Sequence, residues 1–145
     1  MRGLAVAASV AAALALAGCS SGHGDLDAAD SPVARYDWDS GSPREAALLE
    51  GTLELRDGCL LVDQSQDPYK RIVAVFPRQY ASWWAYAKTL RYGGHNFAMG
   101  DLIMAGGGMG TSLPEDGIPA ACLPFIDDKV GVFYIQDEAI EPPSL

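Results

Sequence analysis

The sequence predicts a mainly β protein, a small OB-like β-barrel of five or six strands with one short helix. Short β-branched runs are bounded by glycine and proline, as where Arg71–Phe76 stops at Pro77. Asp57-Gly58 between two alternating runs is a strong hairpin signal. A closed barrel removes the exposed edges that a flat sheet would leave. A small β-sandwich is the alternative, although the chain offers few strands for it.

The opening hairpin has two registers. It joins Gly51–Leu55 to Cys59–Val62, and a two-residue turn places Arg56 opposite Cys59. A three-residue loop with Gly58 left-handed places Leu55 opposite Cys59 instead. A slip of one residue moves every side chain of the second strand to the other face. We favour the three-residue loop, because it turns Cys59 toward the core.

The middle of the chain predicts the short helix. Within Arg78–Lys88, the residues Tyr80, Trp83, Trp84 and Ala87 follow the i, i+3, i+4, i+7 spacing of one helix face. A helix between the third and fourth strands is the order of an OB-fold. The glycine-rich Gly106–Gly110 is expected to be a flexible loop, with glycines that permit a bulge or a close strand approach. Further strands are expected at Thr89–Tyr92, Phe97–Met99, Leu102–Ala105 and Val130–Ile135.

The first residues predict export. Arg2 precedes the apolar run Leu4–Leu16, which is too short for a comfortable membrane span. Leu16-Ala17-Gly18-Cys19 then resembles the lipobox of bacterial lipoproteins. The resemblance implies diacylglyceryl attachment to the Cys19 sulfur, cleavage before Cys19, and anchoring to the outer face of the cytoplasmic membrane. The alternative is an ordinary secretory signal followed by a chance cysteine.

Four segments follow from this assignment. Residues 1–18 are the signal peptide, and 19–47 are the lipidated cysteine with a flexible tether rich in Gly, Ser, Asp, Ala and Pro. Residues 48–138 form the barrel domain, and 139–145 form a disordered tail. Tyr36 and Trp38 are exceptional in the tether; they either dock onto the domain or a partner, or are solvated.

With Cys19 lipidated, Cys59 and Cys122 remain. An exported protein meets an oxidising environment, and two cysteines allow a single pairing. A bridge closing a loop of this size stabilises the fold by about 4 kcal/mol in the chain-entropy model. Two free buried thiols are the alternative.

Charge and composition exclude several function classes. The formal net charge is −9, and removing residues 1–18 takes away Arg2 and no acid, which leaves −10. This acidity argues against nucleic acid as a partner and against direct binding of anionic headgroups. Of the two histidines, His23 lies in the tether, and His95 has no nearby histidine or cysteine at ligand spacing. No metal and no cofactor are therefore expected.

An aromatic cluster is the best candidate contact surface. Adjacent tryptophans cannot easily both point into a small core, and exposed aromatic rings are the usual platform for sugars or peptides. A purely structural cluster is the alternative. The cluster consists of Tyr80, Trp83, Trp84, Tyr86 and Tyr92.

These observations predict a non-enzymatic ligand- or protein-binding module, held at the membrane by the lipid on Cys19. An envelope protein or a glycan is the expected partner. The alternative is a structural or assembly partner of an envelope protein complex. A hydrolase that uses His95 beside a carboxylate and a hydroxyl is less favoured, because the Gly-x-Ser-x-Gly elbow is missing.

The domain also resembles a group of small, uncharacterised lipoproteins of high-GC Gram-positive bacteria. The shared features are Gly58-Cys59-Leu60 after the first strand, Val75-Phe76-Pro77 with a following tryptophan, Gly100-Asp101, and Gly106-Gly107-Gly108. The resemblance supports the fold and implies no activity.

Overall fold

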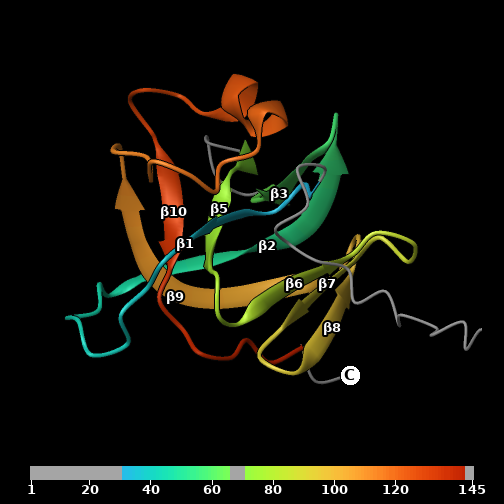
Figure 1. The fold of residues 1–145 in the computed structure, drawn as a ribbon, viewed down its shortest axis with the longest axis horizontal. Helices are drawn as coiled ribbons and strands as arrows, with labels where there is room; N and C mark the ends of the chain where they lie inside the picture. Colours follow the sequence, from blue (N-terminus) through green and yellow to red (C-terminus); the bar gives the residue numbers. More distant parts are fainter. Residues whose placement is uncertain (1–30, 66–70, 143–145) are drawn as a thin grey trace, which may run out of the picture.

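The computed structural model describes residues 31–65 and 71–142. Within these ranges the structure is mainly β with one short 3-10 helix, η1, which confirms the predicted fold class (Figure 1). The elements are β1 (Ala34–Tyr36), β2 (Ala47–Arg56), β3 (Cys59–Asp63), β4 (Arg71–Ile72), β5 (Ala74–Pro77), β6 (Ala81–Trp84), β7 (Thr89–Tyr92), β8 (His95–Ala98), β9 (Leu102–Gly110), η1 (Ala120–Phe125) and β10 (Val132–Ile135).

The larger sheet curls until it closes on itself. Its strands pair in the order β1-β5-β10-β9-β2-β3-β4, and the smaller sheet is the meander β6-β7-β8. β4 and β5 are one extended run interrupted at Val73, whose carbonyl accepts a hydrogen bond from the Phe133 amide (3.0 Å). The first half of this run pairs antiparallel with β3, and the second half pairs parallel with β10. The run therefore joins the two ends of a barrel, in which β2 and β9 make the long curved wall (Figure 1).

The meander covers one end of this barrel. It leaves the barrel after β5 and rejoins it at β9, and its buried side chains belong to the same core as those of β2 and β3. The meander stands where the sequence predicted a helix, so the helix at Arg78–Lys88 is a wrong prediction. Alternating burial over β6, with Trp83 inside and Trp84 outside, shows the two-residue period of a strand. Aromatic residues favour strands, and four residues fit either period.

The hairpin β2–β3 adopts the register that we did not favour. Arg56 pairs with Cys59 and Leu55 with Leu60, so the turn holds two residues. Asp57 and Gly58 both have positive φ, of 49° and 83°, as a type I′ turn requires. Leu53, Leu60 and Val62 therefore point into the barrel. Cys59 points to its outer side, where the second, smaller core lies.

The disulfide between Cys59 and Cys122 is confirmed. Both cysteines are fully buried, with their Cα atoms 4.9 Å apart and a sequence separation of 63. The bridge fastens η1 over the outside of β3 and β5. Under it lies the smaller core, built from Ala34, Leu61, Val73, Val75 and Val132 with the two cysteines.

Gly106–Gly110, expected as a loop, is the second half of β9. Gly107 pairs with both Ala47 and Ile135, between two neighbouring strands. A Cβ on Gly107 would overlap the carbonyl oxygen of Tyr134. The glycines permit the close strand approach that the sequence suggested, but within a strand rather than a loop.

Part of the expected tether and tail belongs to the fold. β1 pairs parallel with β5, and Val33 and Ala34 are fully buried. The carbonyl of Pro32 accepts a hydrogen bond from the Leu60 amide (2.9 Å), which places the start of β1 against β3. At the other end of the chain Ile140 is buried in the barrel core. The predicted boundaries at residues 47 and 139 therefore cut through packed structure; residues 19–30 and 143–145 lie outside the described ranges.

Candidate functional site

The meander β6–β8 has one buried face and one exposed face. Trp83, Leu90 and Phe97 lie opposite one another on the three strands, and all three are buried. The next row, Trp84, Thr89 and Ala98, points the other way. Successive side chains of a strand alternate between faces, so neighbouring tryptophans must separate.

The predicted aromatic cluster therefore divides between core and surface. Tyr92 and Trp83 are buried, and Tyr80 is half-buried against them, with its ring centroid 6.4 Å from that of Tyr92. Trp84 is 53 % exposed on the sheet, and Tyr86 is 94 % exposed in the turn that follows. The structure thus leaves two of the five predicted contact residues facing solvent.

The exposed face of the meander is mostly polar. Beside the row of Trp84 runs a second row, formed by Ser82, Arg91 and Asn96. We call these six residues the outer face of the meander: Ser82, Trp84, Thr89, Arg91, Asn96 and Ala98. Arg91 lies on the strand next to Trp84, diagonally across from it, and Asn96 lies one strand further, so a ligand that extends from the indole across the sheet meets both.

This face lacks the negative charge of the rest of the chain. Residues 79–100 contain Lys88, Arg91 and His95 and no Asp or Glu, although the whole chain has 19 acids. No ion pair to Arg91 is found in the described ranges. The guanidinium is therefore available to a ligand oxygen.

Two tyrosines, the buried Tyr92 and the half-buried Tyr36, stabilise the fold. The Tyr92 hydroxyl donates a short hydrogen bond to the Asp137 carbonyl, and the Tyr36 hydroxyl donates to the Ile135 carbonyl (2.6 Å). Burial raises the pKa of both phenols above its ordinary value, so both stay neutral. The Tyr36 bond holds the end of β10, and the Tyr92 bond holds the segment after it, so both hydroxyls are engaged within the fold.

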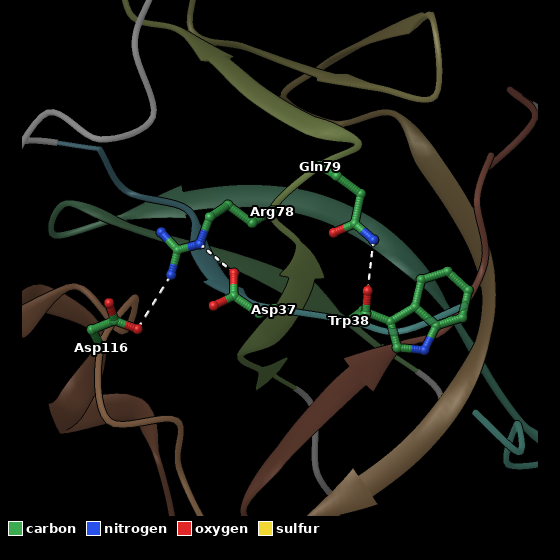
Figure 2. Close-up of polar contacts among 5 residues, drawn as sticks. All are labelled: Asp37, Trp38, Arg78, Gln79 and Asp116. Atoms are coloured by element: carbon green, nitrogen blue, oxygen red, sulfur yellow. Dashed lines mark hydrogen bonds and ion pairs between the residues drawn. The ribbon is translucent and has the colours of Figure 1, made fainter. Parts of the chain in front are cut away.

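A polar clamp holds the N-terminal segment on the barrel. Figure 2 shows Arg78 between Asp37 and Asp116, at 2.9 and 3.3 Å, and Gln79 donating to the Trp38 carbonyl at 2.8 Å. Both carboxylates are more than four-fifths exposed, so these pairs contribute at most about 1 kcal/mol. The clamp positions β1 rather than forming a reactive site.

Trp38 anchors the same segment by packing. Its indole is buried against Tyr80 (centroids 6.2 Å apart) and under the guanidinium of Arg44, 5.3 Å from the ring. The indole Nε1 has no hydrogen-bond partner in the part of the chain that the structure describes. Of the two outcomes that the sequence left open for Trp38, docking onto the domain is the one observed.

The less favoured hydrolase site is not assembled around His95. His95 lies exposed on β8 opposite Tyr92, and its ring makes no side-chain hydrogen bond to a described residue. Asp101 instead accepts a hydrogen bond from the Ala98 amide (2.7 Å). Across residues 31–65 and 71–142, no group of three His, Cys, Asp or Glu is placed to hold a metal ion. His23 lies outside these ranges.

The anchoring prediction concerns residues that the structure does not describe. Cys19 and the lipobox lie before residue 31. From residue 31 onward, the described segments contain no helix long and apolar enough to cross a bilayer. Comparison of the chain with protein-family models, with curated proteins and with solved structures found no significant match.

Proposed function

We propose that this chain is a lipid-anchored protein of the bacterial cell envelope that binds an envelope glycan, without catalysis, on the outer face of the meander. The observation that carries the proposal is the exposed indole of Trp84 among short polar side chains, in a stretch without acids. Large exposed aromatic side chains on a small protein mark interaction sites.

The chemistry of the face suits a sugar. An indole covers the apolar side of a pyranose ring, and the hydroxyls at the rim of that ring need hydrogen-bond partners. Arg91 offers a forked donor, while Asn96 offers both a donor and an acceptor. Ala98, in the same row as Trp84, is too small to cover the ring from that side.

The lipobox supports the location. Eleven residues separate Cys19 from Ser31. A fully extended segment of this length reaches about 40 Å, so an anchored domain stays near the membrane surface and meets the glycans above it. Two or three acyl chains make a stable anchor, since each buried methylene contributes about 0.8 kcal/mol.

Affinity electrophoresis in gels containing polysaccharides of the bacterial wall tests the glycan site. We expect the chain to be retarded, Trp84→Ala to abolish the retardation, and Arg91→Ala to weaken binding about tenfold or more. Tyr86→Ala is the matched control, because it removes an aromatic ring that is even more exposed but lies in the turn after β6 and not on the sheet. Retardation that survives Trp84→Ala overturns the glycan site. A partner protein that co-purifies only when Trp84 is present instead favours the assembly role.

The anchor has a separate test. Cells given an alkyne-bearing fatty acid should label the full-length chain, and Cys19→Ala should abolish the label and release the protein into the medium. Equal labelling of the parent chain and Cys19→Ala contradicts the anchor. This result would not affect the glycan site, which the electrophoresis tests independently.

A further inference from the structure

The barrel has a second candidate site at the end opposite the meander. Here β2 and β10 begin, and β3 and β9 end, around a hollow of about 380 Å³. Small-molecule sites occupy about 300–1,000 Å³ and are common at the mouths of β-barrels. The hollow is therefore large enough for one small ligand.

The floor of the hollow is part of the barrel core. Leu49, Ile72 and Phe133 form it, and each is at most 3 % exposed. At the rim, Leu48 and Met109 are 59 % and 45 % exposed. A ligand that covers large apolar side chains beside an apolar hollow removes them from water, and this burial favours binding.

The polar groups at the mouth of the hollow favour a negatively charged ligand. Of the nine described residues that line the hollow, seven are apolar, and the other two are Gln64 and Lys129. No acid is among these nine, although the chain carries 19 Asp and Glu residues. The nearby Asp127 carboxylate accepts a hydrogen bond from the Lys129 amide (2.7 Å) and closes the turn that presents this lysine. The Lys129 side chain has no ion pair with a described residue.

From these features we infer that the barrel mouth binds the tail of a free fatty carboxylate, with its head group beside Lys129. The apolar walls match an alkyl chain, and the ammonium matches the carboxylate. A methylene group is about the size of a water molecule, whose share of liquid volume is about 30 Å³, so the hollow holds about ten carbons. The site lies at the other end of the barrel from the meander and depends neither on the glycan nor on the anchor.

Isothermal titration of the chain from Ser20 onward, which contains every described residue and no lipid, tests the site with decanoate. We expect saturable binding of one decanoate per chain. Decyltrimethylammonium, which has the same tail and the opposite charge, should bind at least tenfold more weakly. Absence of saturable binding by decanoate, or equal binding of the two probes, overturns the proposal.

Three variants locate the binding. Lys129→Gln should lower the affinity for decanoate five- to tenfold and leave that for neutral decanol unchanged. Lys88→Gln removes an equal charge far from the hollow and should change neither. Ala47 lines the hollow from an exposed position, so Ala47→Phe should fill the space and weaken both ligands without unfolding the chain. Thermal melts verify that each variant is folded. A folded Ala47→Phe that binds decanoate as well as the parent contradicts this location.

Discussion

Trp83 and Trp84 are adjacent in the chain but lie on opposite faces of β6, 6 % and 53 % exposed respectively. Trp83 packs in the barrel core among the buried residues of the meander. Trp84 contributes its ring to the surface on which the proposed function rests. One residue in the sequence therefore separates a tryptophan of the core from the tryptophan to which we assign the proposed binding role.

The first prediction concerns this pair. In the intact chain, acrylamide should quench one red-shifted component of the tryptophan fluorescence, because Trp38 and Trp83 are buried and Trp84 is not. Trp84→Phe should remove that component and change stability by no more than about 0.5 kcal/mol. Trp83→Ala should cost about 3–5 kcal/mol, as for large core aromatics. Strong quenching that persists in Trp84→Phe would contradict the assignment.

The second prediction concerns the N-terminal segment. A chain that begins at Ser31 keeps β1, whereas a chain that begins at Ala47 loses the buried Val33, Ala34 and Trp38. Burying a large apolar side chain is worth about 1.5–3 kcal/mol, so the shorter chain should lose about 5 kcal/mol. Urea unfolding followed by circular dichroism measures the difference. Equal midpoints for the two chains would mean that β1 does not stabilise the barrel.

The third prediction concerns the glycines of β9. Gly107→Ala should destabilise the fold by about 2–3 kcal/mol, because the new methyl group meets backbone of β10. Gly106→Ala is the matched control. The atoms nearest to its methyl group would be those of the Asp137 carboxylate, at 3.2 Å, and this side chain can move aside. We therefore expect a change within about 1 kcal/mol for this control. Denaturant melts that rank the two variants the other way would show that this strand approach is not rigid.

The fourth prediction is a loss of stability at alkaline pH. Burial raises the pKa of Tyr92 in the folded chain, whereas an unfolded tyrosine has a pKa of about 10. The folded chain therefore holds this proton more tightly. The resulting stabilisation is complete below pH 10 and is lost as the pH rises above 10 toward the folded-state pKa. Tyr36 acts in the same direction.

Urea midpoints at pH 8 and pH 11 measure this loss. Tyr92→Phe should lower the midpoint at pH 8, by about 1 kcal/mol of stability for the lost hydrogen bond to Asp137. The further fall between pH 8 and pH 11 should be smaller than in the parent chain. Tyr86→Phe removes an exposed phenol, and the urea midpoint of this variant should fall by as much as that of the parent chain. An identical fall in Tyr92→Phe and the parent would remove Tyr92 as its cause.

Much of the fold could be predicted from local signals. Asp57-Gly58 makes a hairpin because few other dipeptides tolerate positive φ at both turn positions. Arg71–Phe76 is extended, as its β-branched residues prefer, and the strand signals at Thr89–Tyr92 and Leu102–Ala105 also hold. Cys59 and Cys122 form a disulfide, which is the single pairing predicted for the two cysteines that remain besides Cys19.

Other features depend on contacts between distant parts of the chain. The hairpin register follows from which face of β3 meets the barrel core, and the turn residues alone allow either choice. Trp38 is surrounded by polar and small residues in the sequence, and its burial becomes visible only when β1 lies against β5. The hollow at Lys129 is likewise lined by residues from four separate strands and the turn before β10.

By itself the sequence determined the β class, the hairpin turn, the single disulfide pairing and the aromatic residues available for binding. Tertiary structure alone decided that residues 81–84 form a strand, that the glycines of β9 lie inside a sheet, and which tryptophan faces solvent. The reason is physical: backbone propensity and turn geometry act over a few neighbouring residues. Burial and strand pairing depend on partners tens of residues away, and they override weak local preferences.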